Sequence, residues 1–368
     1  MGSRIFNRLH SSLVWGTLSL LVIPSIGLAA PSDDLRSVED HRPITYPPDA
    51  PPPADKPNPV PKQQPSNAVD YRVPALLKDY SGFLWVGSWQ GLTQIDPNTG
   101  RVLARIPTPN PLTGALAQDK VGRIWVGTAE GLFRVDSRTK EVTAQNISLP
   151  SNRILSLQLD KRGYLWVGTD RGLALISPDQ GLLMTTLQDL PGVSANALTL
   201  DKDGHLWVGT LDSLVQVNTA KGKIIQTVEE IPGGAVQTVA ADNHGSIWAG
   251  TPSGLVEVKA RQGQMVRSVT QLRGREIASI RFDTRGTVWV GSGTGLLRLN
   301  PYNGKVLGQI GGLPSDRVLV VSPDTGNKLW VGTTEGLAWV SMSDFRSRPY
   351  DALFATSSAA AQPLLQLR

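Results

Sequence analysis

The sequence predicts an all-β protein, a seven-bladed β-propeller with four antiparallel strands in each blade. Three observations support this fold class. A tryptophan recurs seven times at intervals of 40 or 41 residues, a fixed pattern surrounds each copy, and short segments that alternate between apolar and polar residues flank it. Seven copies of one unit indicate an array of identical structural modules, and four strands in about 41 residues make a propeller blade.

The repeat pattern assigns a structural role to each of its positions. An aspartate stands six residues before every tryptophan, a glycine two after and a leucine seven after; a glycine also stands three before in six copies, and Asn327 in the seventh. The D-x-x-G stretch predicts a tight turn, and the glycine after the tryptophan lets the adjacent sheet approach closely. The recurring tryptophans are Trp85, Trp125, Trp166, Trp207, Trp248, Trp289 and Trp330.

These seven tryptophans are expected to form the structural core between the blades. Burying one such side chain contributes roughly 4–6 kcal/mol. A tryptophan ladder that binds sugar is the alternative, but regular spacing inside a strand favours the core. A helical repeat is excluded, because glycine would interrupt every helix twice at about 1 kcal/mol each.

The two ends of the chain differ from the repeats. Arg4 and Arg8 precede an apolar stretch that ends near Ala29, which predicts a signal peptide over residues 1–29; the alternative is an uncleaved membrane anchor. Residues 30–70 are expected to be a Pro-rich, disordered linker, since 11 of the 27 prolines lie between positions 31 and 65. The propeller is assigned to residues 71–345 and a C-terminal tail to residues 346–368, where residues 346–355 are expected to complete blade seven.

Composition excludes several classes of function. The chain has no cysteine, which rules out a disulfide scaffold, a thiolate zinc site and a cysteine nucleophile. The net charge of +5 comes without a run of lysine or arginine, so no nucleic-acid partner is expected. We expect no metal, no other cofactor, and a periplasmic or secreted location in a bacterium.

The variable positions of the repeat predict a ligand site. The two-residue loops between the second and third strands differ in every blade and share one face with the first residue of each innermost strand. Ring closure would bring Arg72 and Arg317 together at the channel mouth, beside an aromatic plane that suits a sugar acid or a protein carboxylate. A solvated rim is the alternative. The candidate ligand-binding residues are Arg72, Trp89, Gln90, Arg153, Arg171, Arg317 and Glu335.

The pattern D-x-x-G-x-L-W-V-G-T-x-x-G-L, as in residues 160–173, resembles the two-component-regulator propeller repeat. The resemblance covers residues 71–345 and implies a seven-bladed fold with a periplasmic sensing or binding role. The sensors of that family carry a histidine kinase, whereas these 368 residues hold one propeller and no kinase, so signalling would need a partner. A weaker likeness is to streptogramin lyase-type propellers, which need a catalytic histidine on the binding face.

The sequence therefore predicts an exported, non-catalytic propeller that binds a sugar acid or a protein partner, as a sensor-like module or a scaffold. Of four histidines, His10 and His41 precede the repeats, and His205 and His244 lie in D-x-x-G turns on the opposite face. No catalytic residue is assigned for this reason. The alternatives are a polysaccharide lyase or hydrolase that uses tyrosine or arginine, and an assembly factor for a membrane complex.

Overall fold

A computed structural model describes residues 70–108, 113–145, 149–177 and 179–355 of the chain. All of these residues belong to the compact unit Asn67–Arg368. The predicted signal peptide, all of the predicted linker except Asp70, and residues 356–368 of the predicted tail lie outside the described residues. Within the four described ranges, no helix has the length and hydrophobicity needed to cross a membrane.

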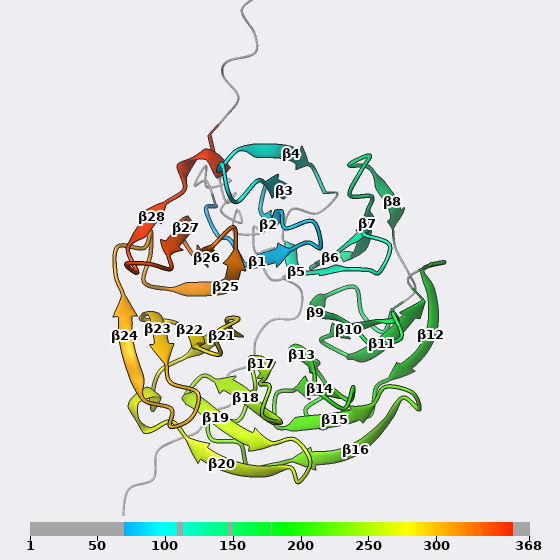
Figure 1. Cartoon of the computed structure of the whole chain (residues 1–368). Helices are drawn as coiled ribbons and strands as arrows, with labels where there is room; N and C mark the ends of the chain where they lie inside the picture. Colours follow the sequence, from blue (N-terminus) through cyan, green and yellow to red (C-terminus); the bar gives the residue numbers. More distant parts are fainter. Residues whose placement is uncertain (1–69, 109–112, 146–148, 178, 356–368) are drawn as a thin grey trace, which may run out of the picture. The chain divides into compact units, whose positions relative to one another are not determined.

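Seven four-stranded antiparallel sheets surround one axis, which confirms the predicted fold class (Figure 1). The sheets follow one another in chain order as blades 1 to 7, and in each blade every strand pairs with the next strand of the chain. The first strand of each blade therefore lies at the axis and the fourth at the rim (Figure 1). Two short 3-10 helices, η1 (Thr270–Leu272) and η2 (Asp351–Leu353), interrupt the strands.

Strand bounds show how closely the blades repeat. The first strands are β1 (Ala75–Lys78), β5 (Thr113–Gln118), β9 (Ile154–Leu159), β13 (Ala197–Leu200), β17 (Thr238–Ala241), β21 (Ile277–Phe282) and β25 (Val318–Thr325). The second strands are β2 (Leu84–Ser88), β6 (Ile124–Thr128), β10 (Leu165–Thr169), β14 (Leu206–Gly209), β18 (Ser246–Thr251), β22 (Val288–Ser292) and β26 (Lys328–Thr333). The third strands are β3 (Gly91–Ile95), β7 (Gly131–Val135), β11 (Gly172–Ser177), β15 (Leu214–Asn218), β19 (Gly254–Lys259), β23 (Gly295–Leu299) and β27 (Gly336–Ser341). The fourth strands are β4 (Val102–Ile106), β8 (Val142–Gln145), β12 (Leu182–Leu187), β16 (Lys223–Val228), β20 (Gln264–Ser268), β24 (Val306–Ile310) and β28 (Ser347–Pro349).

The motif tryptophans lie on the second strands and are at most 1% exposed. In blades 1 to 6 the indole Nε1 donates to a carboxylate oxygen of the aspartate six residues earlier, at 2.8–3.3 Å. The same carboxylate also accepts backbone N–H groups of its turn, as Asp160 does from Arg162 and Tyr164. One buried aspartate thus satisfies the indole and holds the D-x-x-G turn closed.

The glycine two residues after each tryptophan lies against the following blade. A Cβ built there would sit 2.2–2.6 Å from an atom at or just before the innermost strand of that blade, as between Gly87 and Thr113. The last glycine, Gly332, meets the backbone oxygen of Val73 in blade 1 at 2.2 Å. This position therefore needs glycine, because side-chain or backbone atoms of the following blade occupy the place of a Cβ at every junction of the ring.

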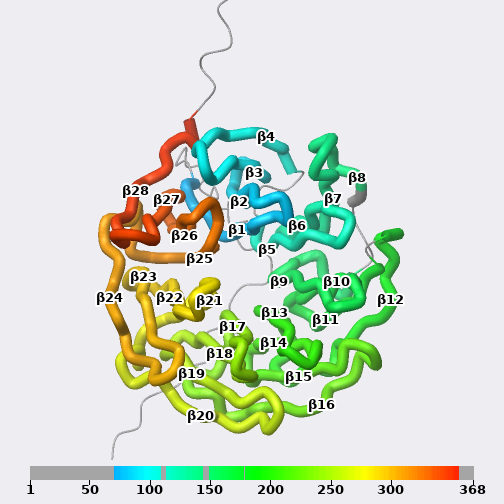
Figure 2. Tube along the Cα trace, in the orientation of Figure 1, coloured from blue at the N-terminus to red at the C-terminus, as the bar shows by residue number. Residues whose placement is uncertain are grey.

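Blade 7 closes against blade 1 through backbone groups and a C-terminal clasp (Figure 2). Val73 N donates to Thr333 O at 3.0 Å, and β28 pairs with β27 as the edge of the last sheet. Arg105 of β4 donates to the carbonyl oxygens of Ala352 and Leu353 in η2, at 2.7 and 2.5 Å. Leu353 is fully buried in the cluster that holds Trp330, so apolar packing and hydrogen bonds close the same junction.

The turn of blade 7 departs from the predicted D-x-x-G geometry. Asp324 does not bond Trp330, whose Nε1 donates to the Thr325 carbonyl at 3.1 Å. The strands β25 and β26 continue to Thr325 and Lys328, and the residues between them, Gly326 and Asn327, have φ of 61° and 54°. Two successive positive φ values are those of a type I′ hairpin turn. Asp324, whose φ is 54°, lies outside this turn at a register shift between Ser322 and Thr325.

Candidate functional site

The face that carries the loops between second and third strands is built from rigid turns. The serine or threonine that ends each second strand accepts the backbone N–H of the second loop residue, as Thr169 does from Arg171 at 3.1 Å. The Thr169 hydroxyl also donates to Gly172 O at 2.9 Å. Loop side chains therefore project from backbone that is already fixed, which lowers the ordering cost of binding.

A cavity of about 280 Å³ opens on this face between blades 1 and 2. It contains two of the predicted ligand-binding residues, Arg72 and Trp89, which the sequence places 17 positions apart. Thr113 of β5 contributes a hydroxyl, and Leu319 of β25 brings in blade 7. The remaining lining residues are Asp70, Pro74, Ser88 and Gly114.

Arg72 is held by a carboxylate that the sequence analysis did not single out. Its Nε and Nη2 donate to Asp70 at 2.9 and 2.5 Å in a two-pronged ion pair. The hydrogen bond from Arg72 lowers the pKa of Asp70, so both groups are charged at neutral pH. Because the Arg72 side chain stays 54% exposed, the pair presents donors and acceptors together to the cavity. The only sequence feature that could have indicated this ion pair is the D-x-R spacing of Asp70 and Arg72.

Two polar atoms of the cavity wall have no hydrogen-bond partner in the described part of the chain. They are the indole Nε1 of Trp89 and the hydroxyl Oγ1 of Thr113, and both are shielded from solvent. A buried polar group without a partner costs about 1–3 kcal/mol, so protein interiors rarely keep one. Both residues line the cavity, so a ligand that reaches these two atoms would satisfy them.

The other predicted residues do not join this cavity. Gln90 accepts from Arg105 at 3.5 Å, while Arg153, Arg171 and Glu335 are exposed on separate loops. Ring closure was expected to set Arg72 and Arg317 side by side as paired guanidinium groups. In the structure each of the two arginines has its own carboxylate partner. Arg317 donates to Glu276 of the preceding blade at 3.4 Å.

The two described histidines lie in the D-x-x-G turns, on the face opposite the cavity. The Nδ1 atom of His205 lies 3.5 Å from Asp201 Oδ2 and 3.3 Å from Gln216 Nε2, in a contact internal to blade 4. His244 packs on the ring of Tyr302, with 5.5 Å between centroids. Within the described ranges, no three metal-ligating side chains cluster together.

Comparisons with known proteins match both the repeat and the fold. The family model described as Two component regulator propeller matches residues 148–171 and 189–212. The extracellular domain of a B. thetaiotaomicron protein described as a one-component system is similar over 74% of this chain, with a TM-score of 0.65 and 20% identity. The extracellular domain of another, described as a hybrid two-component system, is similar over 75%, with a TM-score of 0.61 and 19% identity.

The relation to those structures has clear bounds. The matched region spans 38% and 40% of their own lengths, so this chain corresponds to one part of each. No curated protein sequence matches the chain. At these identities the solved structures establish the fold, and the family model identifies the repeat. The chain is a seven-bladed β-propeller, and two of its segments match the two-component-regulator propeller repeat.

Proposed function

We propose that this protein is an exported, non-catalytic binding propeller that holds a sugar acid or a related polar ligand at the cavity between blades 1 and 2. The two structural neighbours are described as extracellular domains, which supports a periplasmic or secreted location. Their descriptions as one-component and hybrid two-component systems support a sensor-like role, with signalling passed to a partner protein.

One observation carries the location of the ligand. Trp89 Nε1 and Thr113 Oγ1 are buried without partners in the wall of a cavity that the Arg72–Asp70 pair also lines. An indole face with unpaired donors suits a sugar ring, whose hydroxyl groups are acceptors and donors at once. The charged pair supplies a guanidinium for a carboxylate and a carboxylate for a sugar hydroxyl.

Binding of immobilised acidic and neutral glycans by the full chain tests this function. Trp89→Phe keeps an aromatic ring but removes the Nε1–H donor, and we expect it to weaken binding of every bound glycan about tenfold, as expected for loss of a hydrogen bond worth about 1.4 kcal/mol. The matched control is Trp339→Phe, which alters a half-buried tryptophan on β27 outside the cavity and should leave binding unchanged.

Two results would contradict the proposal. Equal affinities for wild type and Trp89→Phe would remove the ligand from this cavity. Unsaturated products released from a bound glycan would replace a binding module with a lyase, the alternative that the sequence left open.

A further inference from the structure

The axial channel opens on the other face of the propeller and forms a second cavity system. A cavity of about 650 Å³ lies at the D-x-x-G end and one of about 210 Å³ lies deeper, and the inner strands of all seven blades line both. They share wall residues, among them Leu76, Leu157 and Arg281. The deeper cavity also shares Pro74, Gly114 and Leu319 with the Trp89 cavity and adjoins it, whereas the wider cavity shares no wall residue with the Trp89 cavity.

Arg281 of β21 is the one ionisable residue in the wall of the deeper cavity, and it lines the wider one too. Its Nη1 donates to the carbonyl oxygen of Ile280 at 2.8 Å, and within the described ranges no carboxylate forms an ion pair with it. The Arg281 side chain is exposed, although protein atoms surround the channel that it lines. Desolvation by these protein atoms lowers the pKa of the guanidinium, which nevertheless stays charged at neutral pH. Because the Arg281 side chain is exposed and has no carboxylate partner in the described ranges, its charge can attract an anion into the channel.

Comparison of the blades shows that Arg281 is the one charged residue at its repeat position. It stands eight residues before the motif tryptophan Trp289, and in the other six blades that position is uncharged. The six equivalents also line the wider cavity, so the position faces the channel all round the ring. They are Leu77, Ala117, Gln158, Thr199, Ala240 and Ser322.

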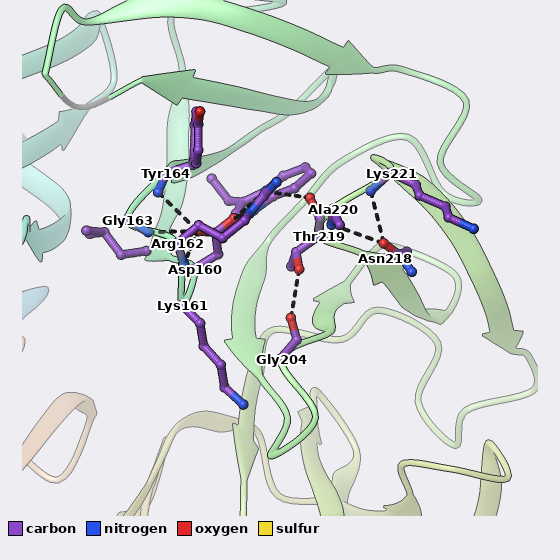
Figure 3. A network of polar contacts seen from close by, with 12 residues as sticks. Asp160, Lys161, Arg162, Gly163, Tyr164, Gly204, Asn218, Thr219, Ala220 and Lys221 are labelled. Atoms are coloured by element: carbon purple, nitrogen blue, oxygen red, sulfur yellow. Dashed lines mark hydrogen bonds and ion pairs between the residues drawn. The ribbon is translucent and has the colours of Figure 1, made fainter.

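The wider cavity adds three lysines at its entrance: Lys78, Lys120 and Lys161. Each is exposed and anchored by one bond to a backbone carbonyl of another blade, as from Lys120 Nζ to Lys161 O at 2.9 Å, which leaves two ammonium hydrogens for a ligand. The one carboxylate in the wall, Asp160, is already bound by Arg162 at 2.6 Å (Figure 3). The entrance therefore carries an excess of positive charge.

A further polar group in the deeper cavity has no partner. The amide oxygen Oε1 of Gln237 is buried and makes no hydrogen bond within the described part of the chain. Because amide oxygen and nitrogen positions are interchangeable, the unpartnered atom is either an acceptor or a donor. An unpaired amide and an unpaired guanidinium thus line the same channel.

We propose that the axial channel is an anion-binding site in which Arg281 holds the carboxylate or sulfate group of a small ligand that enters past the three lysines. A guanidinium binds planar oxyanions through two parallel hydrogen bonds, which fits one anionic group at the base of the site. The rim lysines raise the local concentration of anions and make binding dependent on salt. The inference goes beyond the proposed function, since it adds a second site on the opposite face.

Calorimetric titration of the full chain at low ionic strength tests the site with three probes: sodium sulfate, glucuronate and galacturonate. We expect at least one to bind, and Arg281→Gln to weaken its affinity at least tenfold while abolishing the rise in melting temperature that the probe gives the wild type. Arg285→Gln removes an exposed arginine from the next turn of the same blade and should change affinity less than twofold. Lys120→Gln combined with Lys161→Gln should weaken binding by a smaller factor than Arg281→Gln.

The outcomes separate the two sites and the two sources of the anion. Sugar acids that bind more tightly than sulfate identify a sugar-acid site, and equal affinities identify a site for the oxyanion alone; either supports the proposal. Trp89→Phe must leave these titrations unchanged, even if it abolishes glycan binding at the other face. No binding of any probe by the wild type, or equal affinities for wild type and Arg281→Gln, would overturn the proposal.

Discussion

The two faces of the propeller use their loops in opposite ways. On the face with the Trp89 cavity, each two-residue loop is held by the hydroxyl that ends its own strand, as Gln90 is by Ser88. On the D-x-x-G face, side chains reach from one blade to the next, as Lys161 does to the backbone of Lys202. Hydrogen bonds within a blade leave the side chains of the two-residue loops free to vary. Hydrogen bonds between blades constrain the D-x-x-G turns. The variable loops and the regular turns therefore lie on different faces of the propeller.

Different residues make the contact between blades on the D-x-x-G face. Tyr80 links blade 1 to blade 2, since its backbone N–H and its hydroxyl donate to the side-chain and the backbone oxygen of Gln118. The backbone N–H of Thr284 links blade 6 to blade 7 by donating to the Asp324 carboxylate at 2.6 Å. Lysines make the link from blades 2 and 3. In blades 1, 2, 3 and 6 the residue after the motif aspartate therefore ties neighbouring blades, and the two lysines among these residues add positive charge to the channel entrance.

The largest expected effect contrasts a tryptophan of the repeat motif with a tryptophan in a loop. Trp85 has a counterpart in every blade, and its equivalent Trp207 is fully buried and bonded to Asp201, whereas Trp89 lies in a loop and is half-buried. Trp207→Ala should lower the free energy of unfolding by about 3–5 kcal/mol through loss of buried area and the cavity left behind. Trp89→Ala should lower it by less than about 1.5 kcal/mol. Similar losses in denaturant melts would refute the distinction between core and loop.

The next effect contrasts two aspartates at the same repeat position. Asp160 is buried and accepts from the Trp166 indole and from its own turn, so Asp160→Ala should cost about 2–3 kcal/mol by leaving buried donors unpaired. Asp324 bonds Thr284 at the surface and has no bond to Trp330, so Asp324→Ala should cost less than about 1 kcal/mol. Both free energies of unfolding are measured in urea. Equal losses for Asp160→Ala and Asp324→Ala would mean that the aspartate of blade 7 stabilises its turn as the other motif aspartates do.

A glycine pair tests closure of the ring. Gly332→Ala would place a Cβ 2.2 Å from Val73 O in blade 1, and we expect the forced shift to cost about 1–3 kcal/mol. Gly308→Ala on the outer strand β24 is the matched control, since nothing lies within 4 Å of its added Cβ; its effect should stay within about 0.5 kcal/mol. If the two variants melted alike, the junction of blades 7 and 1 would not be held by backbone contact.

Much of the fold could be predicted because the repeat gives each position one physical role. The motif tryptophan bonds the motif aspartate in six blades, so the repeat pattern is sufficient to predict their sheets. Blade 7 could not be read this way, because Gly326 and Asn327 shift the turn by one residue without changing the spacing from Asp324 to Trp330. The dipeptide Gly-Asn is typical of a hairpin turn, and this local indication differs from the turn that the repeat pattern predicts.

The candidate sites were predictable only where they coincide with the repeat. Arg72 and Trp89 share a cavity because both lie on the loop face of blade 1, which their repeat positions already implied. Their carboxylate, Asp70, precedes the repeats and has no counterpart to compare. Arg281 lies inside a strand, where the expected residue is apolar or small, and only alignment of the seven copies at that position distinguishes it from an ordinary surface arginine.

The smallest expected change in stability comes from the loop face. Arg72→Ala combined with Arg317→Ala removes two exposed ion pairs, to Asp70 and to Glu276, whose side chains share no partner. Exposed pairs contribute about 0–1 kcal/mol each, so the melting curve should barely move. Glycan binding should nevertheless fall, and the single variants assign the loss: Arg72→Ala alone should account for it, because Arg72 lines the cavity and Arg317 does not. A loss of glycan binding that required Arg317→Ala would place the ligand across blades 6 and 7. Unchanged glycan binding in the double variant would show that neither Arg72 nor Arg317 contacts the ligand.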